Sequence, residues 1–183
     1  MGATTARAIS PVKVFAVLLA LVVALAFIPS AAYAATSKTV KKQGFTTELN
    51  VIKKKATKVK KGTTKLTYKA GQGYLKFTAT KTKKYKFTFS NVTGGNNTSN
   101  IYVSIYSPTN YNSITSKKVK TAGGKDSTLW LSANGHTFSN YSNTLYKPIP
   151  KRTGAVKLKK GQTIYMYFNG GYSAKTKAKL VIK

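Results

Sequence analysis

The sequence contains no cysteine, one histidine and two acidic residues among 183. Without cysteine the chain can form no disulfide, so an exported fold must be held together by its hydrophobic core alone. A histidine-based metal site needs several ligands, and His136 is the only histidine. The composition therefore predicts no metal and no cofactor.

The scarcity of acidic residues also argues against most kinds of catalysis. Glycosidases and acid proteases need two carboxylates at one site, and the sequence has only Glu48 and Asp126. We expect each of them to form a salt bridge with a nearby lysine. A triad of Asp126, His136 and a serine is formally available, but no G-x-S-x-G motif accompanies the nearby Ser127, Ser132 and Ser139. Glycine patterns that bind phosphates or dinucleotides are absent as well, so the sequence predicts a protein that is not an enzyme.

The N-terminal segment has the three parts of a signal peptide. Arg7 and Lys13 precede the unbroken apolar run Val14–Ile28, and small residues follow at Ala32-Tyr33-Ala34. This pattern predicts cleavage before Ala35 and export of the remaining chain, without a transmembrane segment after cleavage. The alternative is an N-terminal membrane anchor, which requires about 20 apolar residues, more than this run provides.

Nearly all of the charge is positive and carried by lysine. Removing residues 1–34 from 183 leaves 149 residues with 30 cationic and 2 acidic side chains, a net charge of +28. Arg152 is the only arginine in this part. Such a surface attracts polyanions, but lysine lacks the forked guanidinium with which arginine recognises guanine and phosphate. The composition predicts an anionic polymer as partner and disfavours nucleic acid. The alternative is a soluble surface without a dedicated partner.

Apolar and polar residues alternate with a period of two along much of the chain, which is typical of strands with one buried face. The densest aromatic stretch is Tyr74–Val92, in which two such runs flank the polar link Thr80–Lys83. We predict that these two strands form an antiparallel hairpin on which later strands pack. Further strands are expected at Phe45–Ile52, Leu66–Tyr68, Ile101–Tyr106, Thr128–Leu131, Val156–Leu158, Thr163–Phe168 and Leu180–Ile182.

The predicted organisation is a signal peptide at 1–34, a flexible basic leader at 35–44 and one domain at 45–183. No stretch after the signal peptide shows a 3.6-residue apolar stripe, so almost no helix is expected. The fold class is all-β, a single jelly roll or β-sandwich of about 7–9 antiparallel strands. Trp130 is expected in the core, because its strand is apolar on both faces.

Several stretches together resemble a known family. Their sequences include YLKFT and GAVKLKKGQTIYMYF, and they lie at Tyr74–Thr78, Tyr85–Val92, Ile101–Pro108, Gly154–Phe168 and Lys179–Lys183. Their order and turn residues resemble the bacterial pre-peptidase C-terminal domain family. The resemblance implies a small jelly-roll sandwich that accompanies exported enzymes or surface proteins. The chain departs from the family in leaving no room for a catalytic domain, and it lacks the acidic clusters with which related collagen-binding modules hold calcium.

Two tyrosine pairs form a candidate binding surface. Tyr102 and Tyr106 project from one face of their strand, as do Tyr165 and Tyr167 from theirs. Exposed tyrosines stack on sugars or bases, and lysines beside them hold anionic groups. The alternative is that the long loop Ala133–Arg152 or a partner chain covers these faces. The candidate ligand-binding residues are Tyr102, Tyr106, Tyr165, Tyr167, Lys84, Lys86, Lys157 and Lys159.

These observations predict an exported, non-catalytic, highly basic β-sandwich that adheres to anionic polymers of the cell envelope or its surroundings. Teichoic acid, acidic polysaccharide and mucin glycans are the candidate partners, which favours secretion by a Gram-positive bacterium with non-covalent retention on its cell wall. The alternatives are a neutral-carbohydrate-binding module that uses the exposed tyrosines, or a structural surface protein whose β edges pair between copies. Extracellular nucleic acid stays open, because polyanion attraction does not distinguish phosphate polymers.

Overall fold

The computed structural model describes residues 34–94, 101–139, 145–170 and 175–183. These residues belong to one compact unit, Ala34–Lys183. The predicted signal peptide, residues 1–34, lies outside the described residues except for Ala34. Within the described part of the chain, no helix is long and apolar enough to span a membrane.

The described residues form one short helix, α2 (Leu49–Lys55), and many strands. The longer strands are β1 (Thr36–Val40), β3 (Gly62–Tyr68), β4 (Gln72–Thr78), β5 (Lys83–Gly94), β6 (Ile101–Pro108), β10 (Thr128–Leu131), β13 (Lys151–Leu158), β14 (Thr163–Asn169) and β15 (Thr176–Ile182). The shorter ones are β2 (Thr57–Lys58), β7 (Ile114–Ser116), β8 (Val119–Thr121), β9 (Gly124–Asp126), β11 (Phe138–Ser139) and β12 (Leu145–Tyr146).

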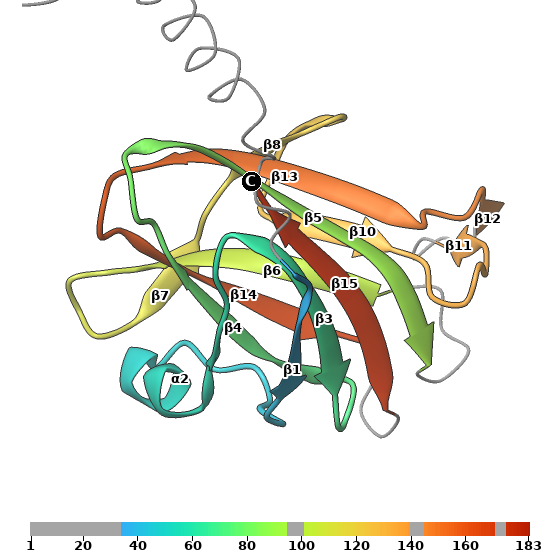
Figure 1. The fold of residues 1–183 in the computed structure, drawn as a ribbon, viewed down its shortest axis with the longest axis horizontal. Coiled ribbons are helices and arrows are strands. Elements are labelled where there is room, and N and C mark those ends of the chain that lie inside the picture. Colours follow the sequence, from blue (N-terminus) through green and yellow to red (C-terminus); the bar gives the residue numbers. More distant parts are fainter. Residues whose placement is uncertain (1–33, 95–100, 140–144, 171–174) are drawn as a thin grey trace, which may run out of the picture. The chain divides into compact units, whose positions relative to one another are not determined.

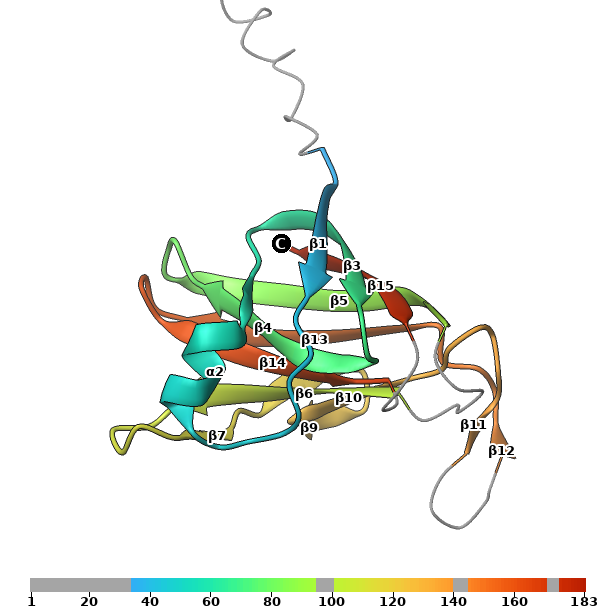
Figure 2. The ribbon, with the colours of Figure 1, turned by 90° about the horizontal axis from the view of Figure 1, so that it is seen from below.

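Apart from the separate pair β11 and β12, the described strands form two sheets that pack face to face, so the predicted all-β sandwich is confirmed (Figures 1 and 2). The seven-stranded sheet has the order β1-β3-β15-β5-β13-β8-β9. The six-stranded sheet has the order β10-β6-β14-β4-β2, with β7 beside β6. Two pairings differ from the antiparallel expectation, since β1 runs parallel to β3 and β2 runs parallel to β4. The predicted loop Ala133–Arg152 contains the paired strands β11 and β12.

The two strands of Tyr74–Val92 do not pair with each other, so the predicted hairpin is wrong. β4 lies between β14 and β2 in one sheet, whereas β5 lies between β15 and β13 in the other. The link between them therefore crosses from sheet to sheet. The predicted inward residues are confirmed, because Phe77 and Phe87 are buried and their ring centroids lie 5.3 Å apart across the core. Because β4 and β5 face each other across the core, each buries the apolar side of the other. If they were neighbours in one sheet, a second layer would still have to cover both.

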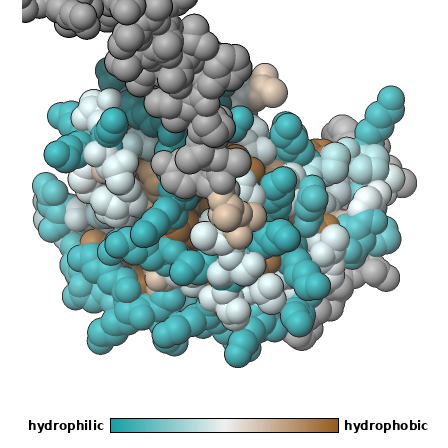
Figure 3. Space-filling model, viewed as in Figure 1, coloured by the Kyte–Doolittle hydropathy of each residue, from teal (hydrophilic) through white to brown (hydrophobic). Residues whose placement is uncertain are grey.

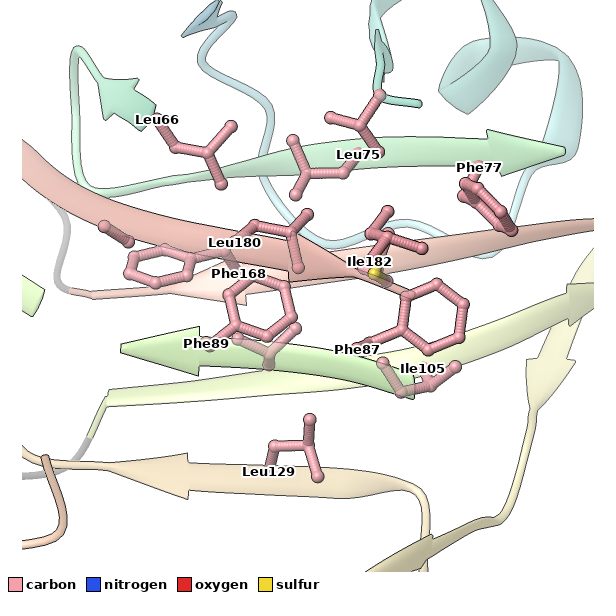
Figure 4. Packing of buried hydrophobic residues seen from close by; sticks show 14 of the residues in the cluster. Leu66, Leu75, Phe77, Phe87, Phe89, Ile105, Leu129, Phe168, Leu180 and Ile182 are labelled. Carbon is pink, nitrogen blue, oxygen red and sulfur yellow. The ribbon is translucent and has the colours of Figure 1, made fainter. Parts of the chain in front are cut away.

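Aromatic and aliphatic side chains from both sheets fill the core (Figure 4). Tyr68 of β3 stacks on Phe168 of β14 with ring centroids 4.1 Å apart, which joins the two layers directly. The labelled side chains that meet in this core are Leu66, Leu75, Phe77, Phe87, Phe89, Ile105, Leu129, Phe168, Leu180 and Ile182. Because every long strand contributes inward side chains, the core ties strands that are distant in sequence into one unit.

The N-terminal part of the domain differs most from the sequence prediction. Residues 35–44 are not a flexible leader, because Thr36–Val40 form β1 and pair with β3 along the whole strand. The predicted strand Phe45–Ile52 is also wrong, since its second half begins α2. Leu49 and Ile52 are three residues apart and bury one face of that helix. Lys53–Lys55 occupy its last turn, where positive charge is favourable. The short apolar pattern fits a helix as well as a strand, and packing against the sheet selects the helix.

Substituting Gly73 tests the docking of this N-terminal segment. A Cβ on residue 73 would lie 2.5 Å from the Lys41 carbonyl oxygen and 2.8 Å from Val40 Cγ1. We expect Gly73→Ala to lower the free energy of unfolding by about 1–3 kcal/mol in urea denaturation, because backbone atoms must shift. Gly44→Ala is the matched control, since a Cβ there meets nothing within 4 Å. Equal midpoints for the two variants would contradict the docking of residues 40 and 41 on β4.

Candidate functional site

The two predicted tyrosine pairs do share one surface, the outer face of the six-stranded sheet. Tyr165 of β14 lies directly opposite Tyr106 of β6, and Tyr167 lies opposite Tyr74 of β4. The aliphatic residues between them point into the core, as the alternation predicts. Adjacent strands thus gather several aromatic rings on one side of the sandwich.

Much of this tyrosine surface is covered, whereas the sequence predicts that it is exposed. Tyr165 and Tyr167 are only 1% and 2% exposed. They pack with Leu49 and Ile52 of α2 in a second hydrophobic cluster beside the main core. The alternative of a covered face is therefore correct for these two residues, but the cover is α2 rather than the loop Ala133–Arg152. Figure 2 shows α2 beside the β4 and β14 end of this sheet.

Hydrogen bonds fix the covered tyrosines in place. The Tyr74 hydroxyl donates to the Thr46 carbonyl oxygen at 2.8 Å and accepts from the Thr46 amide at 3.2 Å. Burial raises the pKa of Tyr74 to about 12, although the hydrogen bond with Thr46 lowers it. The Tyr167 hydroxyl donates to Gln72 Oε1 at 2.6 Å. Both hydroxyls form hydrogen bonds within the protein, so they are not available as free groups for a ligand.

The rest of the tyrosine surface is half-buried and carries an additional aromatic residue, Trp130. Contrary to prediction, Trp130 does not lie in the core, because it sits opposite Tyr102 on the outer face while its neighbours Leu129 and Leu131 point inward. The rings of Tyr102 and Trp130 lie 5.2 Å apart. Phe45 is 56% exposed, and its ring lies 5.8 Å from that of Tyr106. These residues form the aromatic strip: Phe45, Tyr102, Tyr106 and Trp130, which are partly exposed on β6, on β10 and before α2.

The four predicted lysines lie on the opposite side of the sandwich from the tyrosines. Lys84 and Lys86 of β5 and Lys157 of β13 are exposed on the outer face of the seven-stranded sheet. Lys84 and Lys157 are direct cross-strand partners. Lys159 follows β13 and is also exposed. The combined tyrosine and lysine site predicted from the sequence is therefore not formed, because the two sets belong to different layers.

The lysines instead gather with others that the sequence reading missed. Cross-strand pairing places Lys65 opposite Lys179, Lys179 opposite Ser90, and Ser90 opposite Lys151. A second row pairs Ala155 with Lys86 on one side and with Lys120 on the other. Lys183 exchanges backbone hydrogen bonds with Lys86 and extends this row. We call this surface the lysine face: Lys65, Lys84, Lys86, Lys120, Lys151, Lys157, Lys179 and Lys183. The alternation of lysine with apolar residues in KTKAKLVIK was the available signal for part of it.

Two shallow grooves run over the lysine face on either side of Lys179. One has a volume of about 440 Å³ and is lined by β3, β15 and the end of β5, including Lys65 and Lys177. The other has a volume of about 580 Å³ and is lined by residues of β5, β13 and β15, including Lys86 and Lys151. Figure 3 looks onto this side of the sandwich and shows hydrophilic side chains spread between the few visible hydrophobic ones. Lysine residues therefore line both grooves.

The two carboxylates take structural positions apart from this face. Glu48 precedes α2 rather than lying in a strand. Asp126 Oδ1 accepts a hydrogen bond from the Thr128 amide at 3.0 Å. Among the described residues, no group of three or more histidine, cysteine, aspartate or glutamate side chains is arranged to hold a metal ion. Nothing in this part of the chain places paired carboxylates at one site.

Comparison with known proteins gives a distant likeness in structure. No protein family and no curated protein matches the chain. Among solved structures, the chain is similar to PliG of Aeromonas hydrophila, described as a periplasmic lysozyme inhibitor of g-type lysozyme, with 12% sequence identity and a TM-score of 0.28. The comparison covers 82% of this chain and 100% of that one. A likeness at this level carries no information about the partner of this protein.

Removing single hydroxyl groups tests the structural role of the covered tyrosines. Tyr167→Phe breaks the buried hydrogen bond to Gln72, so we expect it to lower the free energy of unfolding by about 1–3 kcal/mol. Tyr165→Phe is the control, because the structure gives its hydroxyl no hydrogen bond within the described residues, and we expect it to leave the urea midpoint nearly unchanged. The prediction fails if Tyr167→Phe is as stable as the wild type and instead weakens ligand binding.

Proposed function

We propose that this protein is an exported, non-catalytic adhesion module that binds anionic polymers of the bacterial envelope through its lysine face. Teichoic acid and acidic polysaccharides, including those of mucin, are the polymers that fit this chemistry. The observation that supports the proposal most directly is the arrangement of Lys65, Lys179 and Lys151 in one row across neighbouring strands. Export and membership of the pre-peptidase C-terminal domain family stay predictions from the sequence.

The lysine face lowers the stability of the folded domain, so its lysines are better explained by binding than by folding. Like charges directly opposite each other on a sheet destabilise it by a few tenths of a kcal/mol per pair. Lys65 faces Lys179 and Lys84 faces Lys157 in this way. With two acidic residues in the whole chain, nearby carboxylates cannot neutralise so many lysines. A bound polyanion would relieve this repulsion, so binding and stability are linked.

The geometry of a sheet suits a polymer with regularly repeated charges. Successive outward residues on one strand lie about 6.6–6.8 Å apart, and neighbouring strands are about 4.8 Å apart. A flexible chain of phosphates or carboxylates can therefore contact several ammonium groups at once along the two grooves. Each contact releases condensed counterions, so binding should weaken steeply with salt. Lysine suits this role because a hydrated point charge does not demand one fixed ligand orientation.

A second candidate function is binding of neutral glycans by the aromatic strip. Phe45 is 56% exposed, and Tyr102 and Trp130 are only half-buried beside each other. Aromatic rings of this kind stack on the apolar faces of sugars. The burial of Tyr165 and Tyr167 leaves a smaller surface than the sequence predicts. Such binding would persist in high salt, which separates it from the lysine-face mechanism.

Binding of residues 35–183 to purified Gram-positive cell walls across a salt series tests the proposal. We expect binding to be lost by about 0.5 M salt and on walls stripped of teichoic acid, because screening weakens each contact. Replacing Lys65, Lys151 and Lys179 together by glutamine should reduce the slope of log affinity against log salt by about two to three. Replacing Lys53, Lys54 and Lys55 on α2 by glutamine is the matched control with the same change in charge. Equal losses in both triple variants would contradict a specific face and leave only net charge.

The proposed conflict between binding and stability gives a separate prediction. Lys179→Gln removes one of two opposed charges, so we expect it to raise the free energy of unfolding by about 0.2–1 kcal/mol at low salt, measured by urea denaturation. The gain should shrink as salt screens the pair. Lys160→Gln is the control, because Lys160 is exposed in the turn between β13 and β14 and has no cross-strand partner. A destabilised Lys179→Gln variant would show that this lysine serves the fold.

A further inference from the structure

A second cavity lies at the open edge of the sandwich, away from the grooves of the lysine face. Its volume is about 190 Å³. It is bounded on one side by β10 of the six-stranded sheet and on the other by β8, β9 and β13 of the seven-stranded sheet. Its lining includes Lys125, Asp126, Thr128, Leu129, Trp130 and Arg152. The cavity brings together the only tryptophan, the only arginine beyond residue 34 and one of the two acidic residues.

Arg152 is held in position across the two sheets. It lies opposite Phe89, a core residue, so its side chain starts on the inward side of β13. Its Nε donates a hydrogen bond to the Trp130 carbonyl oxygen at 3.3 Å. This bond uses Nε alone, and the two terminal amino groups provide the forked arrangement that matches a carboxylate. The contact with β10 restricts the guanidinium before any ligand arrives, which lowers the entropic cost of binding.

The charges around the cavity favour a ligand with a single negative charge and neutral polar groups. Lys125 and Arg152 contribute two positive charges and Asp126 one negative charge, which leaves a net charge of +1. Asp126 would repel an anionic group placed beside it, so the ligand anion belongs near Arg152. Asp126 uses Oδ1 to accept from the Thr128 amide at 3.0 Å. The second carboxylate oxygen can accept from a hydroxyl group.

Leu129 gives this polar cavity an apolar wall, because its side chain points inward from β10. Trp130 also borders the cavity, but its indole lies on the outer face of the six-stranded sheet. Its side chain is half-buried, and its ring contacts that of Tyr102 at a centroid distance of 5.2 Å. A leucine side chain beside hydroxyl-accepting and carboxylate-binding groups suits a sugar ring, which has both apolar C–H faces and polar edges. A phosphate chain offers no such apolar face, and a polyanion does not match a site with one acidic member.

We propose that this edge cavity binds one sugar acid, a pyranose with a single carboxylate, with Arg152 on the carboxylate and Asp126 on a hydroxyl. This site goes beyond the proposed polymer adhesion, because it selects one residue by its shape and charge. It does not depend on the lysine face, and either site can fail without the other. Lys125 lies at the rim on the exposed β8–β9 hairpin and adds attraction for the anion.

Tryptophan fluorescence reports on the surroundings of Trp130, because it is the only tryptophan. Binding on the aromatic strip would also change its emission, and the neutral sugar below detects that case. The probe is methyl glucuronoside titrated into residues 35–183 in 0.5 M NaCl, where lysine-face binding is screened. We expect a saturable change in emission. Methyl glucoside, which lacks the carboxylate, and acetate, which lacks the ring, should give no saturable change at the same concentrations. Absence of saturation with methyl glucuronoside, or equal responses to all three compounds, would overturn the proposal.

Two variants test the assigned roles with the same readout. Arg152→Lys keeps the charge but loses the fork, so we expect the apparent Kd to rise about tenfold or more. Lys125→Gln changes only an exposed hairpin residue, so we expect it to raise the Kd severalfold without affecting folding. This variant can still be measured if Arg152→Lys is unstable. Lys179→Gln on the lysine face should leave the Kd unchanged. An unchanged Kd in both Arg152→Lys and Lys125→Gln, or an equal rise in Lys179→Gln, would contradict the assignment. Cell-wall binding at low salt tests the lysine face separately.

Discussion

Apolar contact between the two sheets is the interaction on which every other feature of this domain depends. Residues 35–183 carry a net charge of +28 and contain no cysteine to link the strands. Self-repulsion of that charge opposes folding, so burial of aromatic and aliphatic side chains must outweigh it. The Tyr68–Phe168 stack and the Phe77–Phe87 contact join the layers at two separate points. Without these contacts the two sheets would not be held together.

The same packing sorts the remaining residues into two very different surfaces. Since inward positions are apolar, the alternate positions of each strand must face outward. On the seven-stranded sheet those positions carry lysine, and pairing sets like charges opposite each other, as in Lys65 and Lys179. On the six-stranded sheet they carry tyrosine, and α2 covers part of that surface with Leu49 and Ile52. Charged and aromatic groups therefore lie on opposite sides of the sandwich.

The N-terminal segment packs on both sheets, and this explains why its local sequence does not predict its structure. β1 adds a parallel strand beside β3, and the chain then crosses β4 at Gly73, where a side chain would meet the Lys41 backbone. It continues as α2 over the tyrosine surface. A basic, polar stretch such as residues 35–44 has no pattern that distinguishes a docked strand from a leader. Its place is decided by an available sheet edge and not by its own composition.

Composition and alternation by themselves determined the all-β class, the inward residues of most strands, and the lysine-dominated charge that motivates a polyanionic partner. They determined these because period-two burial and net charge are properties of the chain that survive any arrangement of strands. Only the tertiary structure decided that the two strands of Tyr74–Val92 face each other instead of pairing, and that Trp130 points outward. It also decided that the predicted tyrosines and lysines lie apart, and that Arg152 meets Trp130. Strand order depends on contacts between residues far apart in sequence, so a local pattern does not predict which sheet a strand will join.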